Sequence, residues 1–385
     1  MPTSLLSRRA LLVDAPLAAA LSRAVQPPRP AADHAVARVA EGIFRRDPMP
    51  ALSVAVYRGN ALAFSRAYGD ADLELGVAAL PDHRFRIGSG AKPITATLAA
   101  ILADQGVVDL DAGIGRYLPA LPSAHQATTL RQLLIHRGGI RHYSPRDSDR
   151  SAAGGAVDRR TYFSATDILA VFIDDPLVAP PGTRMLYSTF GYTLASIVLE
   201  QAAGVPFLDL IERKVAAPLG LASLGADAPR RVVPGRVRGY GPASQVRELP
   251  PVSGTWANAP MNNPAYKWAG GGLVSTMADL ARFGAAHLQP GVLPKRVLDT
   301  LFTVHVPDSS PPLGLGWRVD RDGKGRLRWH HAGGQDGARS SLVVYPEQRL
   351  SIAFASNATG TPGDVLTPSV QLADAVLTGD APGVR

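Results

Sequence analysis

A serine and a lysine stand three residues apart in the stretch FRIGSGAKPIT, which runs from Phe85 to Thr95. Apolar residues follow at helical spacing, which predicts that Ser89 and Lys92 open a helix and share one face of it. A serine hydroxyl needs a neighbouring base to become a nucleophile at neutral pH, and a desolvated lysine can be that base. The positive end of the helix dipole also favours an anion at Ser89. The spacing therefore predicts a nucleophile beside its base.

Lysine is rare in this chain. Among 40 basic residues the lysines are Lys92, Lys214, Lys267, Lys295 and Lys324. Arginine cannot lose its proton in a protein, whereas a buried lysine can. A Ser-x-x-Lys spacing also arises by chance, and the alternative for Lys92 is a surface lysine behind a helix cap. The other parts of the site must decide between the two.

A tyrosine could complete the proton-transfer group. Tyr187 lies in the stretch PGTRMLYSTFGY, before a predicted helix. Its hydroxyl could relay a proton near Lys92, because a neighbouring cation favours tyrosinate. The alternative is an aromatic side chain that only packs against the helix.

Two glycine-rich stretches follow later in the chain. In WHHAGGQ, from Trp329 to Gln335, small residues stand at the end of a predicted strand, where a backbone can approach a ligand. The backbone amides of Ser89 and Gly334 could then form an oxyanion hole; the alternative is a glycine turn between two strands. The stretch that begins at Lys267, KWAGGGL, is interpreted as structural, with its lysine at the surface or rim rather than as a second base.

Composition limits the class of protein. The chain has 385 residues, 46% of them hydrophobic, and a net charge of +8. It has no cysteine, which excludes disulfides, thiol nucleophiles and cysteine-ligated metal sites. Its arginines are scattered in short pairs without interleaved aromatic residues, so we expect no nucleic-acid partner. No stretch is long and apolar enough to predict a membrane span.

The N-terminus is predicted to lie outside the fold. Residues 1–30 contain SRRALL at Ser7–Leu12, which resembles a twin-arginine export signal, and an alanine- and leucine-rich run follows. The alternative is a disordered N-terminus of a cytoplasmic protein. The sequence favours a periplasmic or secreted location over a cytoplasmic one.

The order of predicted elements indicates an α+β protein. Strands lie near both ends and helices in the middle, so we expect one antiparallel sheet flanked by terminal helices, with an inserted, mostly helical domain and a cleft between them. We assign residues 31–88 and 290–380 to the sheet-containing domain and 89–289 to the insert. The predicted strands are 51–57, 61–68, 314–319, 326–330, 340–345 and 350–355; the predicted helices include 31–47, 190–203, one capped by Thr276 and 365–377.

Taken in chain order, three motifs resemble those of the serine beta-lactamase and penicillin-binding-protein superfamily, in its class C-like and family VIII esterase branch. They are Ser89-x-x-Lys92, Tyr187-Ser188-Thr189 and His331-Ala332-Gly333. The stretches 140–143, 187–194 and 266–272 are also similar to the mitochondrial serine beta-lactamase-like proteins and their bacterial relatives. The resemblance covers roughly residues 35 to 360. It implies a beta-lactamase/transpeptidase-like fold and an acyl-enzyme mechanism without metal or cofactor.

The resemblance also implies roles for single residues. Ser89 would be the nucleophile, and Lys92 and Tyr187 would share the work of general base and acid. His331 would occupy the cation position of the third motif, and Gly334 would supply the second oxyanion amide. Thr189 and Gly333 would stand at substrate-binding positions.

Three departures from the family pattern bear on the substrate. Thr189 replaces an asparagine that holds a substrate amide, and it offers only a hydroxyl. His331 and Ala332 replace a lysine and a threonine that receive the substrate carboxylate, and histidine is mostly neutral at pH 7. These changes favour a small ester or peptide over a penicillin-like substrate. Arg141 or Arg339 could supply the missing charge.

The leading hypothesis is therefore a serine hydrolase that acts on a small ester or peptide. A true beta-lactamase or D,D-peptidase is the alternative within the class. An alternative of another class is a non-catalytic binding or filament-forming protein on the same fold, for which self-association is expected. A metallohydrolase is disfavoured, because the spacings of the candidate ligands match no helix-borne pair; those ligands are His136, His142, His330 and His331.

Overall fold

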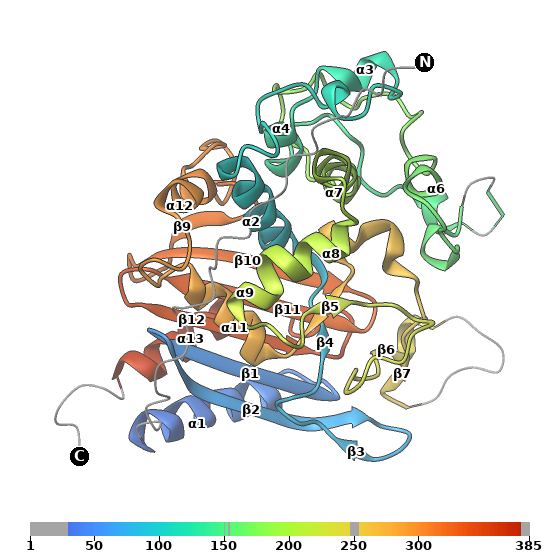
Figure 1. Cartoon of the computed structure of the whole chain (residues 1–385). Helices are drawn as coiled ribbons and strands as arrows, with labels where there is room; N and C mark the ends of the chain where they lie inside the picture. Colours follow the sequence, from blue (N-terminus) through green and yellow to red (C-terminus); the bar gives the residue numbers. More distant parts are fainter. Residues whose placement is uncertain (1–29, 150, 153–154, 247–253, 379–385) are drawn as a thin grey trace, which may run out of the picture.

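The computed structural model describes residues 30–149, 151–152, 155–246 and 254–378. It is an α+β protein in which an antiparallel sheet forms one end and a helical region forms the other (Figure 1). The sequence-based prediction of the fold class is confirmed. The export-signal-like segment predicted for residues 1–30 lies, except for its last residue, outside the described residues.

The main sheet combines strands from both ends of the chain. Its seven strands lie in the order β3-β2-β1-β12-β11-β10-β9, and the paired neighbours are antiparallel. The central pair joins β1 to β12, so segments about 300 residues apart in sequence lie side by side. The strands are β1 Ala51–Arg58, β2 Ala61–Asp72, β3 Val77–Ala78, β9 Arg318–Arg321, β10 Leu327–Gln335, β11 Ala338–Tyr345 and β12 Leu350–Ser356.

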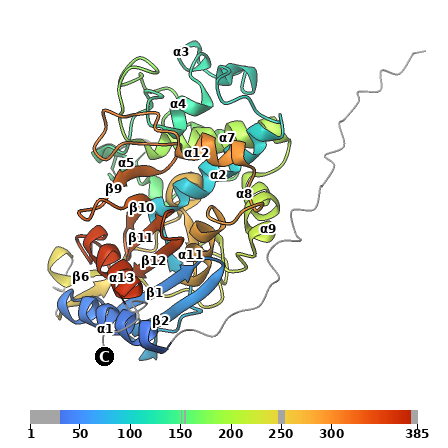
Figure 2. The ribbon, with the colours of Figure 1, turned by 90° about the vertical axis from the view of Figure 1, so that its left-hand side faces the viewer.

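Helices cover both faces of this sheet. The terminal helices α1 (Pro30–Arg46) and α13 (Leu366–Thr378) pack on each other and on one face, and α11 (Met277–Ala286) packs on β1 and β12 from the other face (Figure 2). Strand β1 is buried on both sides, which explains its nearly unbroken apolar sequence. Its side chains alternate between the two faces: Val54 and its like-facing neighbours lie in the cluster under α1 and α13, and Ala55 and Tyr57 lie in the cluster with α11.

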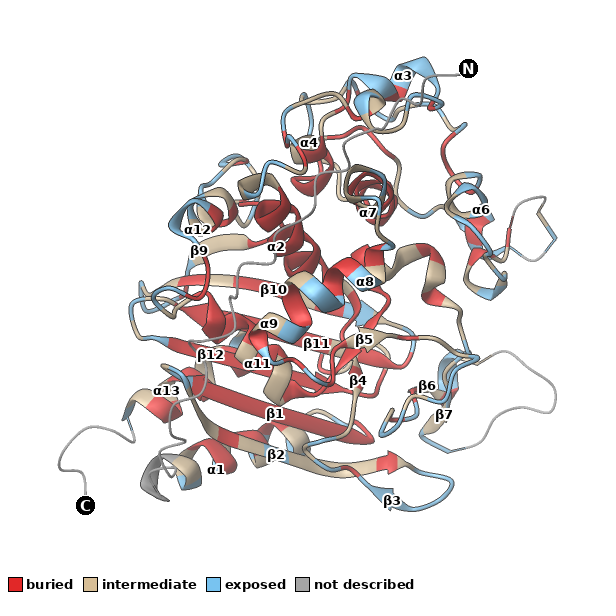
Figure 3. Cartoon of the chain, in the orientation of Figure 1, coloured by how far each residue is buried: buried red, intermediate tan, exposed pale blue. Residues whose placement is uncertain are grey.

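The helical region is built around α2 (Ala91–Asp104). Every residue of this helix from Ala91 to Leu102 is buried, as the red ribbon in Figure 3 shows. Such a helix belongs to a core rather than to a surface. Gly106 follows it with φ +71°, in the left-handed conformation that suits a glycine after a helix. The helices that pack on α2 are α7 Thr189–Ala203, α8 Phe207–Ile211, α10 Trp268–Gly271 and α12 Lys295–Phe302.

Two predicted strands differ from the observed ones. The prediction of a strand over 314–319 is wrong for 314–317, because the amide of Leu315 donates to the carbonyl of Leu301 and Gly316 turns the chain with φ +75°; β9 begins at Arg318. The strand predicted over 326–330 continues to Gln335 as part of β10. The strand thus runs through its glycines, which excludes the alternative of a glycine turn there, and the turn comes after them.

The smaller elements connect these two regions. Two short sheets, β4-β8-β5 and β6-β7, lie beside the helices. Among the described residues no single helix is long and apolar enough to cross a membrane; α7 and the chain from Phe207 to Leu219 meet that test only together, with a bend of 79°. The division into domains at residues 88 and 289 stays a prediction.

The remaining short strands and helices are β4 Phe85–Arg86, β5 Gly225–Ala226, β6 Tyr240–Pro242, β7 Trp256–Asn258, β8 Leu273–Ser275, α3 Ser123–Gln126, α4 Leu130–Leu134, α5 Pro145–Ser148, α6 Ala165–Leu169 and α9 Ala217–Leu219. The short 3-10 and π turns are η1 Gly88–Gly90, η2 Ile114–Arg116, η3 Val157–Arg159, η4 Glu212–Ala216, η5 Ala243–Gln245 and η6 Pro264–Lys267.

Candidate active site

Ser89 stands at the N-terminal end of the buried helix α2. It is the middle residue of the turn η1, which joins the end of β4 to the helix. Gly88 takes φ +49° in this turn, a conformation that costs glycine little. The half-buried Ser89 lines a cavity of about 460 Å³, which we call the catalytic pocket. The fold thus places the hydroxyl of Ser89, in the turn directly before the buried helix α2, at an open pocket.

Lys92 lies directly behind this serine. Its side chain is fully buried, and its Nζ lies 3.2 Å from the Oγ of Ser89. The same Nζ lies 2.5 Å from the carbonyl oxygen of Gly270 and 3.4 Å from Oγ1 of Thr189. Burial lowers the pKa of Lys92 to about 7. The amine can therefore be neutral near pH 7 and accept a proton from the serine.

Tyr187 approaches the same serine from the loop before α7. Its hydroxyl donates to the Oγ of Ser89 over 2.9 Å. Burial raises the pKa of Tyr187 to about 12, although the bond to Ser89 and the charge of Arg318 act in the opposite direction. The sequence-based expectation that a cation would favour tyrosinate is not met, because burial outweighs it. Tyr187 is a neutral phenol that can pass a proton on.

Two histidines hold the segment that carries Tyr187. Nδ1 of His136 accepts a hydrogen bond from the amide of Ser188 at 3.2 Å, and Nδ1 of His142 accepts one from the amide of Thr189 at 3.3 Å. The ring of His136 packs 4.3 Å from the ring of Tyr187. Burial lowers the pKa of His136 well below its usual value and that of His142 to about 4. Both rings are therefore neutral, so Nδ1 of each ring can accept a hydrogen bond from a backbone amide.

Sequence reasoning considered these histidines only as metal ligands. His330, from the same set, lies 3.3 Å from a carboxylate oxygen of Asp320. Among the described residues no group of three or more histidine and acidic side chains could hold a metal ion. The support that His136 and His142 give to backbone amides had no sequence signal of its own, because each contact joins segments about 50 residues apart.

The third motif lies on β10 and carries no charge. Nδ1 of His331 lies 2.7 Å from the carbonyl oxygen of Ala332, and the side chain is buried. Burial, followed by the charge of Lys92, lowers the pKa of His331 to about 3. His331 is therefore neutral at pH 7 and offers no cation to a substrate carboxylate.

The glycines of β10 allow it to lie directly against the turn at Ser89. A Cβ atom on Gly333 would lie 2.0 Å from the carbonyl oxygen of Ile87, so only glycine fits there. A Cβ atom on Gly88 would lie 2.7 Å from the amide nitrogen of Gly334. The amide of Gly334 thus lies next to the backbone of Gly88, which precedes Ser89, and Ser89 and Gly334 both line the catalytic pocket. An oxyanion hole built from the backbone amides of Ser89 and Gly334 needs the two segments to lie this close.

The remaining candidates separate into two groups. Thr189 lines the catalytic pocket, and so do Arg339 and Lys267, although Lys267 was interpreted as a surface or rim residue. Arg141 does not line the pocket, because its guanidinium is held by Asp147 at 2.7 Å and by the carboxylate of Asp175. Arg339 is therefore the arginine that can face a substrate.

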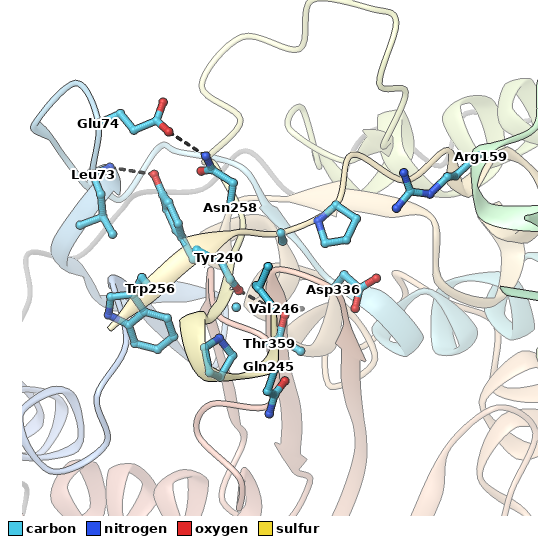
Figure 4. Close-up of a pocket in the computed structure, with 15 residues that line it drawn as sticks. Leu73, Glu74, Arg159, Tyr240, Gln245, Val246, Trp256, Asn258, Asp336 and Thr359 are labelled. Atoms are coloured by element: carbon cyan, nitrogen blue, oxygen red, sulfur yellow. Dashed lines mark hydrogen bonds between the residues drawn. The ribbon is translucent and has the colours of Figure 1, made fainter. Parts of the chain in front are cut away.

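A second cavity continues the catalytic pocket. This side pocket of about 800 Å³ shares Asp336 and Thr359 with the catalytic pocket, so the two form one cleft. Figure 4 shows that Tyr240, Trp256 and other residues of β6 and β7 form much of its wall. The hydroxyl of Tyr240 accepts from the amide of Leu73 at 2.8 Å, which ties this wall to the end of β2. The cleft therefore has room for a substrate that extends well beyond Ser89.

Comparisons with known proteins show the family and the fold of this chain. A family model described as Beta-lactamase matches residues 33–377. The chain is 26% identical over 400 residues to the mouse serine beta-lactamase-like protein LACTB, mitochondrial, across 78% of this chain and 70% of the relative. It is 26% identical over 372 residues to the D-alanyl-D-alanine-carboxypeptidase/endopeptidase AmpH of Escherichia coli K12, across 89% and 90%. The crystal structure of a D-stereospecific amidohydrolase from Streptomyces sp. is similar with a TM-score of 0.73 and 26% identity, across 91% and 99%.

Proposed function

The chain belongs to the beta-lactamase family and is a serine hydrolase, and from this premise we propose that Ser89 is the nucleophile that a substrate acylates. The observation that carries the proposal is the meeting of Lys92 and Tyr187 on one hydroxyl, at 3.2 and 2.9 Å from the Oγ of Ser89. A serine with a dry amine and a phenol within hydrogen-bond reach has the arrangement that nucleophilic catalysis requires.

In the first step Lys92 acts as the base. Its neutral amine takes the proton of Ser89 while the Oγ attacks the carbonyl carbon of the substrate, so one C–O bond forms and the carbonyl oxygen becomes an oxyanion. The backbone amides of Ser89 and Gly334 donate to that oxygen. We assign this step to Lys92 rather than Tyr187, because the pKa of Lys92 is lowered to about 7 and that of Tyr187 is raised to about 12.

In the second step the oxyanion collapses and the leaving group departs. Lys92, now protonated, returns the proton through the hydroxyl of Tyr187 to the leaving oxygen or nitrogen, which leaves an ester on Ser89. A water molecule then attacks this ester, with the same amine and phenol taking its proton. Hydrolysis releases the acid and restores the serine.

We propose a small ester or a peptide as the substrate. His331 is neutral and Ala332 lacks a hydroxyl, so the third motif cannot bind a carboxylate as penicillin-recognising relatives do. The side pocket gives room for a peptide, and the Streptomyces neighbour is named an amidohydrolase. A true beta-lactamase or D,D-peptidase is the second candidate, favoured by the relative AmpH, whose name gives a D-alanyl-D-alanine substrate.

Replacement of Ser89 by alanine tests the proposal. We expect Ser89→Ala to abolish hydrolysis of p-nitrophenyl butyrate and of D-aminoacyl amides, while circular dichroism and the melting temperature stay at wild-type values. Ser148→Ala is a matched control, because that serine lies on the short helix α5 and away from the pocket. Turnover by Ser89→Ala at the wild-type rate would exclude Ser89 as the nucleophile. A nitrocefin assay compares the beta-lactam class with these substrates.

A non-catalytic binding or filament-forming role is the alternative of another class. Wild-type protein that hydrolyses none of the esters, amides and cephalosporins, and that assembles into filaments in electron micrographs, would support that role. The proposal for self-association is checked separately by light scattering of the purified chain.

We also propose export through the twin-arginine-like segment. That segment lies outside the described residues, so the proposal rests on the sequence alone. Cell fractionation of a bacterial host should find the protein in the periplasm, and the double change Arg8→Lys with Arg9→Lys should retain it in the cytoplasm. If the wild-type protein and the double variant divide between periplasm and cytoplasm in the same proportion, export by this route is contradicted.

A further inference from the structure

Lys267 lies in the wall of the catalytic pocket. It is the last residue of η6 and directly precedes α10, whose carbonyl at Gly270 accepts from Lys92. A Cβ atom on Gly271 would lie 3.8 Å from Cδ of Lys267 and 3.5 Å from the carbonyl carbon of Gly88. The stem of Lys267 is therefore separated from the backbone before Ser89 by a single glycine.

The ammonium of Lys267 has no acidic partner in hydrogen-bond reach. Among the described residues it makes no hydrogen bond or ion pair, and its contact is with the ring of Tyr266, whose centroid lies 5.7 Å from Nζ. Lys295 and Lys324, in contrast, form ion pairs with aspartates at 2.7 and 2.9 Å. A half-buried cation that the protein does not pair is available to a ligand.

The charged residues of the catalytic pocket are mostly basic. Its lining includes Lys267, Arg339 and Asp336. Arg339 donates to the carbonyls of Pro362 and Gly363 at 3.3 and 2.9 Å, which fixes the guanidinium while its charge stays at the pocket. The exposed Asp336 accepts from Asn262 at 2.7 Å. The lining of the catalytic pocket, without the side pocket, thus carries two positive charges and one negative charge.

Burial does not remove the charge of Lys267 at neutral pH. It lowers the pKa of Lys267 to about 8, and the nearby carboxylate of Asp336 acts in the opposite direction. Lys267 therefore stays mainly protonated at pH 7, whereas His331, which is buried on β10 and does not line the pocket, is neutral. The positive charges of the pocket therefore lie on Lys267, between η6 and α10, and on Arg339 of β11, while the third motif on β10 carries none.

We propose that Lys267 binds a carboxylate of the acyl part of the substrate, so that the enzyme prefers acyl groups that end in a free carboxylate over neutral acyl groups of the same length. The inference rests on the proposed function, because it names the substrate class of the same site. Arg339, which also lines the pocket, adds to its positive field. The carboxylate would lie on a different wall from that used when the third motif carries a lysine, so the substrates need not resemble penicillins.

Matched esters test the preference directly. The acids are glutaric, adipic and pimelic acid, each as the mono-p-nitrophenyl ester and as the corresponding p-nitrophenyl methyl diester, with the non-enzymatic rate subtracted. We expect kcat/KM of wild-type enzyme to favour the best free carboxylate over its methyl ester by about tenfold or more, as for a hydrogen bond between charged groups. The preference should shrink as sodium chloride is added, because salt screens a partly exposed pair.

Variants assign the preference to Lys267. In Lys267→Met the ratio of the two kcat/KM values should fall by about tenfold, mostly through KM of the carboxylate, and Lys267→Arg should keep most of the ratio. Lys295→Met is the control, because that lysine is exposed on α12, and it should leave the ratio unchanged.

The outcomes separate this inference from the proposed function. Equal kcat/KM for carboxylate and methyl ester in wild-type enzyme overturns the role of Lys267, and so does an unchanged ratio in Lys267→Met. If the wild-type enzyme cleaves no ester, and a fluorophosphonate probe does not react with Ser89, the proposed function is overturned instead. The wild-type comparison and its salt dependence need no variant, so they hold even if Lys267→Met does not fold.

Discussion

The Nζ of Lys92 lies 3.2 Å from the Oγ of Ser89, and the lysine side chain has no exposed surface. The two residues share a helical face because they are three positions apart. The contacts of the amine are neutral groups: the Ser89 hydroxyl, the Gly270 carbonyl and the Thr189 hydroxyl. A lysine in such surroundings loses its proton more readily than one in water.

Lys92→Arg should therefore inactivate the enzyme although a basic side chain is kept. A guanidinium cannot take the proton of Ser89, and loss of a general base costs about 10²- to 10⁴-fold in rate. Lys92→Met should be equally inactive; because it leaves the buried Gly270 carbonyl without its donor, its melting temperature is measured beside kcat. The measurement is kcat on p-nitrophenyl butyrate, with Lys295→Met as control. Activity of Lys92→Arg above one-tenth of wild type would contradict the assignment.

The rate should rise with pH around neutrality. The active form of Lys92 is the neutral amine, so kcat/KM falls when the amine is protonated and rises to a plateau above its pKa of about 7. Tyr187, whose pKa is raised to about 12, should cause no decline below about pH 10. Stopped-flow kinetics on an uncharged ester measure this profile. A midpoint near the ordinary lysine value of about 10 would mean that Lys92 is not dry.

His136 should matter through the position of Tyr187. Its backbone has φ +60°, its side chain is buried, and its Nδ1 accepts a hydrogen bond from the amide of Ser188. His136→Ala leaves that amide without a partner, so we expect a loss of about 1–3 kcal/mol in the free energy of unfolding and a lower kcat. His136→Asn should recover part of both, because asparagine tolerates a positive φ and offers an acceptor. Urea denaturation and kcat check this; equal effects of the two variants would argue against the hydrogen bond.

Gly333→Ala should disrupt the site from the strand side. Its Cβ would lie 2.0 Å from the carbonyl oxygen of Ile87, which forces β10 away from the turn at Ser89. We expect kcat to fall by about 10²-fold or more, as for a lost oxyanion donor. Gly323→Ala is the matched control, because nothing lies within 4 Å of a Cβ there. Wild-type kcat in Gly333→Ala would show that the closeness of β10 is not needed.

The local parts of the site were predictable from the sequence, and the distant contacts were not. The helix after Ser89 and its pairing with Lys92 follow from spacing and apolar periodicity, which act within one turn. The supports from His136 and His142 were missed, because their partners are backbone amides of a distant segment. Lys267 was interpreted as a surface or rim residue rather than a second base, and only the fold shows that it lines the catalytic pocket.

Glycines explain why β10 was predicted too short. The predicted strand ended at His330, before the glycines, because glycine weakens a strand in isolation. In the fold they lie inside β10, where the absence of a Cβ lets the strand contact Ile87 and Gly88. The requirement comes from a non-local backbone contact, and a single sequence does not reveal it.

Covalent labelling of Ser89 tests the central claim most directly. A fluorophosphonate should lose fluoride as its phosphorus bonds to the Oγ of Ser89, so the intact mass should rise by one adduct. The label should map to the tryptic peptide from Ile87 to Arg116, which stays whole because Lys92 precedes a proline. Ser89→Ala should take up no label. One equivalent of label on another residue, or undiminished labelling of Ser89→Ala, would contradict the account.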